Sequence, residues 1–328
     1  MKTLYLDCFS GISGDMFIGA LIDAGADPGK LAEELRKLRI EEEYGLEWRK
    51  VVKNGITSTK FDVILKQAGE HPHEHQHAHE HGHSHEHAHT HDHEHTHGHD
   101  HTHGHDHEHD HDHEHRHDHD HDHTHDHMHP HSHEHEHSHS HDHTHSHSHD
   151  HGHSHHHHHD HRSYKDIVKL IQEAGFEQPV EQLALRIFKK IGEAEGKIHG
   201  MPLDKVHFHE VGAVDSIIDI VGAAILIHEL KVDVIRSSPV PVGKGKIRID
   251  HGIYPVPAPA TLEILKGTPL EQSDIRGELT TPTGAALVSV LAEEYGPIPS
   301  MSVSAIGYGA GTKTFAEHPN VLRVMIGE

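Results

Sequence analysis

Histidine is the residue type that offers most chemistry in this chain, and it is concentrated in one stretch. Of the 54 histidines, 48 lie between His71 and His161, where every odd-numbered position is histidine. Twenty acidic residues and a single base are interleaved with them, so the stretch carries −19 of the formal net charge of −25. Neutral imidazole suits Ni, Zn and Cu, and carboxylates add oxygen ligands, so the stretch predicts a segment that binds on the order of ten metal ions. It includes the unbroken run His155, His156, His157, His158 and His159.

The composition of this histidine tract, residues 71–161, also indicates how it would work. Low hydrophobicity and repetition leave little to offset the entropy of ordering, so we expect disorder in the absence of metal. Protons compete with metal for imidazole, and acid below about pH 6.5 should release the ions. Because a flexible coil does not preorganise an open coordination position, the tract favours storage or delivery of metal over catalysis. A tag or low-complexity drift is the alternative, which the internal position and the length of the alternation disfavour.

A second candidate site lies in the segment HFHEVGAVDSIID at 207–219. A strand at its start would put the two histidines on one face, and a helix after it would put two aspartates, four residues apart, on one face. Asp219 stands among isoleucines and a valine, where a carboxylate is costly to bury unless it is paired or bound to a cation. We expect a catalytic role for Asp219. The candidate metal ligands are His207, His209, Glu210 and Asp215. The alternative is that Asp215 caps a helix and the histidines satisfy backbone groups.

Gly-containing turns supply a further set of candidates. Backbone amides at a helix N-terminus attract anions, although none of the turns matches a Walker A or dinucleotide-binding fingerprint, and each can also be a plain turn. The candidates for binding a cofactor are Gly11, Gly14, Lys244, Lys246 and Gly284. Asp7 and Asp15 flank the first of these turns and are candidates to orient a metal or a substrate as catalytic residues. No Ser-His-Asp order or Cys-His pair can be argued from the spacing, which disfavours covalent hydrolytic catalysis.

The elements that must position these residues follow from apolar periodicity. Strands are predicted at 2–9, 46–52, 60–66, 206–211, 234–242, 302–308 and 321–326, and helices at 16–24, 28–38, 163–174, 180–195, 214–230, 258–265 and 284–295. The strands on either side of Asn54-Gly55 are expected to pair, and 246–250 suggests a short hairpin arm. This order predicts an α/β fold, a mixed sheet with helices.

The domain organisation follows from the size of the segments. Residues 1–70 offer too small a core for independent stability, and closing a long flexible loop costs only about 2 to 3 kcal/mol more than closing a short one. We therefore predict one α/β core built from 1–70 and 162–328, interrupted by a long disordered His-rich insertion at 71–161.

Composition excludes several classes of partner. Outside the tract roughly 44% of residues are apolar, as in globular proteins, while a slightly acidic balance with few aromatics argues against nucleic acid. No apolar stretch is long enough to span a bilayer, and no signal peptide is apparent at the start. The single cysteine, Cys8, fits a reducing compartment. We expect a cytoplasmic protein with no nucleic-acid or membrane partner, and with a homo-oligomer among its possible states.

Several long motifs, in this order, resemble those of the LarC nickel-insertion family. They are DCFSGISGDM at 7–16, VHFHEVGAVDSIIDIVG at 206–222, PVPVGKG and HGIYPVPAPAT within 239–261, GELTTPTGAAL at 277–287 and GYGAGT at 307–312. The similarity spans essentially the whole sequence outside the tract. A histidine-rich insertion of varying length is also similar to that family.

The resemblance implies a nickel chelatase of the lyase class that acts in biosynthesis of the nickel-pincer cofactor. Such a protein binds Ni(II) and inserts it into pyridinium-3,5-bisthiocarboxylic acid mononucleotide, with hydrolysis of CTP in the presence of Mg or Mn. Fuller-length members of the family continue past the position of Glu328 with a part associated with CTP binding. By this resemblance the chain corresponds to the N-terminal piece of a split or frameshifted protein, and a separately encoded C-terminal part is a candidate partner.

Two other functions remain open at the level of sequence. The tract alone would suit a nickel storage protein or metallochaperone without catalytic activity. The cluster from His207 to Asp219 alone would suit an unrelated divalent-metal hydrolase.

Overall fold

The computed structural model describes residues 1–66, 162–208, 213–249 and 251–328. The predictions for the histidine tract, including His155, His156, His157, His158 and His159, lie outside these residues, as do those for His209 and Glu210.

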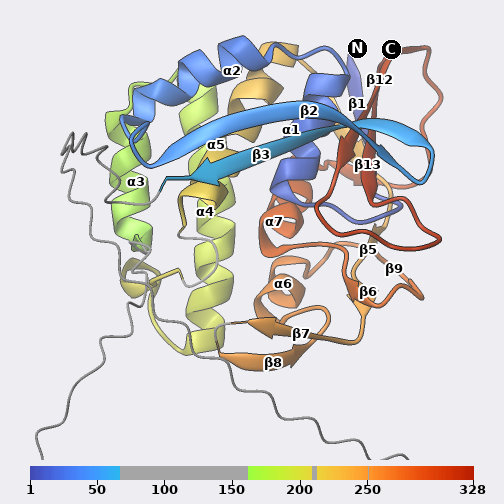
Figure 1. Cartoon of the computed structure of the whole chain (residues 1–328). Coiled ribbons are helices and arrows are strands. Elements are labelled where there is room, and N and C mark those ends of the chain that lie inside the picture. Colours follow the sequence, from blue (N-terminus) through green and yellow to red (C-terminus); the bar gives the residue numbers. More distant parts are fainter. Residues whose placement is uncertain (67–161, 209–212, 250) are drawn as a thin grey trace, which may run out of the picture. The chain divides into compact units, whose positions relative to one another are not determined.

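A mixed seven-stranded sheet organises the fold, in the order β11-β4-β1-β13-β12-β3-β2 (Figure 1). Its strands are β1 (Thr3–Asp7), β2 (Tyr44–Lys53), β3 (Ile56–Leu65), β4 (Val234–Ser237), β11 (Glu294–Tyr295), β12 (Val303–Ala310) and β13 (Val321–Gly327). Strand β1 runs parallel to β4 and antiparallel to β13, and β3 meets β12 in parallel. Strands from both sides of the tract thus alternate in one sheet, and the α/β prediction is confirmed.

The β2–β3 hairpin forms where the sequence predicts it. Asn54 and Gly55 have φ angles of 46° and 84°, as a two-residue turn between antiparallel strands requires, and Lys53 pairs with Ile56 across it. Strand β3 begins at Ile56 and not at Lys60, because the ladder runs unbroken from the turn. In Figure 1 this hairpin crosses the helices as a long ribbon.

The described residues form seven α-helices, of which the first, the fifth and the seventh pack directly on this sheet. The seven helices are α1 (Gly14–Asp23), α2 (Pro28–Leu35), α3 (Tyr164–Glu173), α4 (Gln178–His199), α5 (Val214–Leu230), α6 (Pro259–Ile264) and α7 (Pro282–Leu291). The 3-10 turns η1 (Arg36–Leu38) and η2 (Leu203–Lys205) follow α2 and α4. The predicted cap at Ser163 is a capping box with Asp166. Within the described part of the chain, no helix is both long enough and apolar enough to cross a membrane.

The core lies between α1, the long helices and the sheet. Helix α1 packs on β12, β3 and β13 and also contacts α5 and α7. The largest fully buried side chains include Phe17, Phe61, Phe188 and Phe208, so residues from both sides of the tract share one hydrophobic core. Burial of this kind dominates the free energy of folding, and it holds the first turns of α1, α5 and α7 against one another.

Three of the predicted elements differ from the structure. The strand expected at 206–211 is absent over 206–208, where His207 makes only an isolated bridge to Ser163. The strand expected at 234–242 stops at Ser237, because the sequence SPVPV carries prolines that break a ladder. The helix expected at 284–295 begins at Pro282, where proline suits the first turn, and ends at Leu291.

Short strands connect the rest. They are β5 (Val240–Pro241), β6 (Gly243–Lys244), β7 (Lys246–Ile249), β8 (Gly252–Pro255), β9 (Leu270–Glu271) and β10 (Gly277–Glu278). Strands β7 and β8 pair antiparallel, which confirms the hairpin arm.

Candidate functional site

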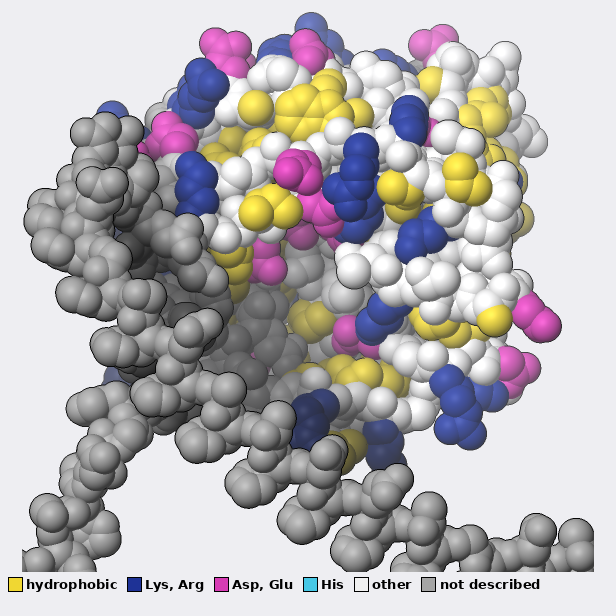
Figure 2. Space-filling view, viewed as in Figure 1, with side chains coloured by type: hydrophobic (Ala, Val, Ile, Leu, Met, Phe, Trp, Pro, Cys, Tyr) yellow, Lys and Arg dark blue, Asp and Glu magenta, His cyan; other side chains and the backbone are white. Residues whose placement is uncertain are grey.

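A cleft of about 340 Å³ opens where α1, α5 and α7 begin. Figure 2 shows acidic and basic side chains side by side on the face that carries the β2–β3 hairpin. The volume of the cleft falls in the range of small-molecule sites. We call it the acidic cleft. It is lined by Ser13, Gly14 and Asp15, by Lys60, Phe61, Asp62 and Val63, by Asp215, Ser216 and Asp219, and by Glu278, Thr281, Pro282, Thr283 and Thr312.

Two glycines allow the helix ends to come this close. A Cβ atom on Gly14 would lie 2.3 Å from Oδ2 of Asp219, and one on Gly284 would lie 1.9 Å from the carbonyl oxygen of Ile12. Neither contact leaves space for a side chain. The backbone N–H of Thr281 donates to that same Ile12 carbonyl at 3.1 Å, so α7 starts directly against the turn that leads into α1.

Residues of the first turns of the three helices line the cleft. At the start of α7, the Oγ1 atom of Thr281 accepts a hydrogen bond from the N–H of Gly284 at 3.2 Å. At α1 and α5, the N-cap residues Ser13 and Ala213 provide no side-chain cap. Uncapped amides at a helix N-terminus favour negatively charged ligands.

Asp219 is the residue of this site whose buried carboxyl group lacks a partner for one oxygen. Its Oδ1 atom is shielded from solvent and has no hydrogen-bond partner. Burial raises the pKa of this carboxyl well above its ordinary value of 3.8, and the neighbouring Asp15 and Asp215 raise it further, with Lys60 acting in the opposite direction. A carboxylate in this position gains from a cation or from a proton.

Lys60 links two of the other carboxylates. Its Nζ atom lies 2.5 Å from Oδ2 of Asp15 and 2.9 Å from Oδ1 of Asp62, and its side chain is only 7% exposed. Burial alone would lower the pKa of Lys60, but these two carboxylates outweigh burial and raise it. For Asp62, burial acts upward and the hydrogen bonds from Lys60 and Arg49 outweigh it, so the pKa of Asp62 is lowered.

The charge balance of the cleft is acidic. Among its lining residues, all of them within the described part of the chain, five carry carboxylates and Lys60 alone carries a positive charge. Burial also raises the pKa of Glu278, partly offset by Lys313, whose Nζ atom lies 3.9 Å from Oε2 of Glu278. The cleft can therefore attract cations to its carboxylates and hold anionic groups at its helix ends.

The structure brings together some of the residues that the sequence singles out. Asp15, Asp215, Asp219 and Gly14 all line the cleft, and Gly284 lies in the first turn of α7. Asp215 is not the cap of α5, because Ala213 is at that position, and its Oδ1 atom accepts from the N–H of Ser216 at 2.7 Å.

Other candidates lie outside the cleft lining. Asp7 is paired with Arg323, whose Nε atom donates to its Oδ2 at 2.7 Å. Gly11, with a φ of 81°, packs against the backbone of Leu279. The side chain of His207 is exposed.

The two lysines of the Gly243–Lys246 turn are also elsewhere. Lys244 is exposed, with its Nζ atom 2.6 Å from Oδ1 of Asp274, and Lys246 is exposed on β7. Neither lines the cleft.

Sequence reasoning missed Lys60, Asp62 and Glu278. A signal existed for the first two, because residues i and i+2 of a strand share a face and opposite charges there predict a pair. For Glu278 the signal was only its place near a Gly-containing turn. Across the described residues, no group of three or more His, Cys, Asp and Glu side chains is already arranged to hold a metal ion.

The fold and the cleft together define an α/β protein whose site suits a ligand with groups of both charges. The family described as "Nickel insertion protein" matches residues 4–328. The chain belongs to this nickel insertion protein family.

Relatives in the family agree with this assignment. The chain is 44% identical over 328 residues to a "Pyridinium-3,5-bisthiocarboxylic acid mononucleotide nickel insertion protein" of Geobacillus kaustophilus, covering 100% of this chain and 60% of the relative. Proteins with the same description in Clostridium kluyveri and Staphylococcus epidermidis are 40% and 36% identical, with 62% and 59% of each relative covered. The chain thus spans about three fifths of the length of these relatives. No solved structure matches it.

Proposed function

We propose that this chain acts in biosynthesis of a nickel-pincer cofactor, as a nickel chelatase that inserts Ni²⁺ into pyridinium-3,5-bisthiocarboxylic acid mononucleotide in the acidic cleft. The observation that carries this proposal is the meeting of three helix N-termini with the carboxylate of Asp219. Membership of the nickel insertion protein family supports the choice of metal, and the names of the relatives support the choice of nucleotide.

The charges of such a nucleotide suit both parts of the cleft. Its phosphate and thiocarboxylates are anionic and suit the first turn of α1, whose N-cap Ser13 provides no side-chain cap. Its pyridinium ring and the incoming nickel are cationic, and they can be balanced by the carboxylates of Asp15, Asp215 and Asp219. The lysine of the site, Lys60, holds Asp15 and Asp62 in position.

Insertion between the two sulfur groups also calls for a proton acceptor. Thiocarboxylates at ring positions 3 and 5 flank position 4, so nickel held by both sulfurs faces the hydrogen on that carbon. A nickel–carbon bond forms there as the carbon–hydrogen bond breaks, and its proton leaves. We assign Asp219 as the acceptor, because a carboxyl whose pKa is raised by burial is a stronger base than an exposed one.

Nickel would reach the cleft from the histidine tract. Asp215, in the first turn of α5, is the cleft residue closest along the chain to His207, His209 and Glu210, so we propose these four as the residues that receive the ion. Asp7 is a poor candidate for chemistry because it is occupied by Arg323. CTP, with Mg or Mn, is assigned to the part of the relatives that lies outside the matched region.

The proposal is tested by following the mass of the nucleotide. The full chain is incubated with Ni²⁺, the bisthiocarboxylate nucleotide, CTP with Mg or Mn, and the C-terminal part of a relative. We expect a product heavier by one nickel and lighter by the displaced proton. Asp215→Asn, in the cleft, should reduce the yield, whereas Asp274→Asn, on an exposed side chain, should leave it unchanged. No product from the wild-type chain, under conditions where a full-length relative forms it, would reject the proposal.

A further inference from the structure

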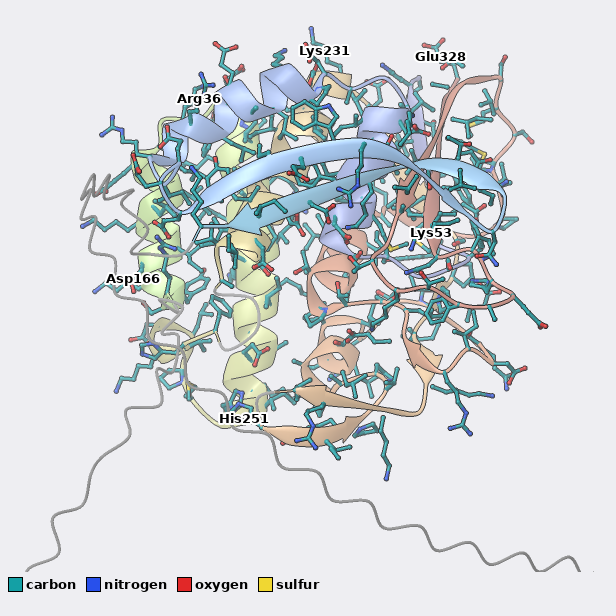
Figure 3. All side chains as sticks on the ribbon, viewed as in Figure 1. Arg36, Lys53, Asp166, Lys231, His251 and Glu328 are labelled. Atoms are coloured by element: carbon teal, nitrogen blue, oxygen red, sulfur yellow. The ribbon has the colours of Figure 1, made fainter. Side chains whose placement is uncertain are left out.

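A second group of metal-ligating side chains lies away from the acidic cleft, at the end of α4. Glu195 and His199 come from the last turns of this helix, and His251 comes from the turn between β7 and β8. All three line a cavity of about 50 Å³ that shares no residue with the acidic cleft. Figure 3 labels His251 beside the C-terminal end of α4.

Glu195 is the residue that makes this group unusual. It lies on the buried side of α4, only 8% exposed, next to apolar neighbours such as Ala194. Burial raises the pKa of Glu195, and the groups that oppose this rise are His199 and His251. A buried carboxylate is retained in such a place when positive charge or a metal ion balances it.

Glu195 and His199 form a pair whose spacing also suits two ligands of one metal ion. The Oε2 atom of Glu195 lies 3.3 Å from Nε2 of His199, within hydrogen-bond range. Two ligands with bonds of about 2.0 to 2.1 Å to one tetrahedral ion are about 3.3 to 3.4 Å apart. The observed separation equals that spacing.

The two imidazole rings lie close enough to share one ion. Their ring centroids are 5.1 Å apart, with planes inclined at 60°. The centroid of an imidazole ring lies about 1.1 Å from the nitrogen that binds the metal, on the side away from the ion. Two imidazoles on one tetrahedral ion therefore have centroids about 5 Å apart. Across the described residues, no group of three or more His, Cys, Asp and Glu side chains could hold a metal ion as it stands. The exposed His251 would have to turn its ring to complete the group.

We propose that Glu195, His199 and His251 bind one divalent transition metal ion of the nickel and zinc type. Two imidazoles and one carboxylate are a donor set that such ions prefer over Mg²⁺ or Ca²⁺. The ion ties the end of α4 to the β7–β8 hairpin. This site does not depend on the function assigned to the acidic cleft.

Thermal unfolding of the full chain can separate this site from the tract. Ions bound by the histidine tract alone should bind the folded and the unfolded chain alike and leave the unfolding temperature unchanged, whereas an ion held only by the folded core raises it. We expect buffered Ni²⁺ and Zn²⁺ to raise the unfolding temperature of the wild type more than that of His251→Gln. His228→Gln is the matched control, because His228 is on another helix and pairs with Glu177 at 3.1 Å.

A second measurement follows the rate of chemical modification of each histidine separately. Carbethoxylation, followed by mass spectrometry, should modify His199 and His251 up to about 100-fold more slowly at free metal 100 times the dissociation constant. His228 should react at the same rate throughout, and Mg²⁺ should protect none of them. Unchanged rates at both residues, protection by Mg²⁺ equal to that by nickel, or an equal gain in unfolding temperature for His251→Gln and wild type would each overturn the proposal.

Discussion

Single side chains decide what the acidic cleft can bind. Asp219 has an unpartnered oxygen in a site that other carboxylates make more negative, and Lys60 restrains two of those carboxylates. The apolar neighbours of Asp219 in the sequence are enough to predict that it needs a partner. The pairing of Lys60 with Asp15 is not predictable in this way, because it joins α1 to β3 across 45 residues.

Asp219→Asn should stabilise the chain in the absence of metal and weaken its use of nickel. The substitution keeps the shape of the side chain and removes an uncompensated buried charge. We expect it to raise the unfolding free energy by about 1 kcal/mol or more at neutral pH. The folded pKa is raised, so in the wild type stability falls as pH rises above 3.8 toward that pKa. Denaturant unfolding at several pH values measures this fall, which the variant should lack. Asp274→Asn serves as the exposed control, and an equally steep fall in both variants would contradict the account.

Lys60→Met should be strongly destabilising. It leaves the partly buried Asp15 without its cation, while Asp62 keeps its pair with Arg49, and breaking a buried pair costs about 3 kcal/mol or more. Lys50→Met removes an ion pair with Asp23 in which the lysine is 63% exposed, and it should cost less than about 1 kcal/mol. Chemical denaturation of both variants provides the comparison. Equal losses of unfolding free energy in the two variants would show that burial does not strengthen the ion pairs of Lys60.

The ion pair between Lys60 and Asp62 also determines part of the loss of stability in acid. Because the pKa of Asp62 is lowered in the folded state, its contribution to stability is fully present above 3.8 and is lost as pH falls through the lower folded value. The wild type should therefore lose more stability on acidification below pH 4 than Lys60→Met does.

At the scale of elements, the site depends on how closely three helices approach. The sequence predicts α1, α5 and most of α7, since their apolar periodicity is strong. It does not predict that α7 begins at Pro282 against Ile12, because that contact is set by tertiary packing and not by local pattern. The expected strand at 206–211 also fails, since alternation of buried Val206 and Phe208 with exposed His207 occurs in extended chain without a ladder.

Gly284→Ala should separate α7 from the turn before α1. The added Cβ would lie 1.9 Å from the Ile12 carbonyl oxygen, so the backbone must shift, and overpacking of this kind costs about 1 to 3 kcal/mol or more. Gly296→Ala meets nothing within 4 Å and should be tolerated. Unfolding temperatures and nickel insertion assays on both variants check this. A fully active, fully stable Gly284→Ala chain would show that the close approach is not required.

On the scale of the whole molecule, the chain combines one interleaved core with a histidine-rich segment. The sheet order places strands from before and after the tract next to one another, as the small size of residues 1–70 leads one to expect. Composition predicts metal binding by the tract, but it does not show which face of the core receives the ion, because a repeating sequence has no preferred contact.

Nickel carried by the tract should be released by acid. Imidazoles take up protons as pH falls through about 6.5, and proton uptake displaces metal. Equilibrium dialysis should show bound nickel, on the order of ten ions per chain at neutral pH, falling steeply over that interval. A stoichiometry that stays constant down to pH 5 would be inconsistent with imidazole ligands.

The most direct measurement compares nickel insertion by the full chain, by a chain without residues 71–161, and by that shortened chain carrying Asp219→Asn, all at saturating nickel with the C-terminal part supplied. Formation of metallated nucleotide should persist when the tract is removed and should fall about 100-fold or more when Asp219 is replaced, as expected for loss of a general base. Loss of all activity with the tract, together with an Asp219→Asn chain as active as its parent, would show that the cleft does not carry out the insertion.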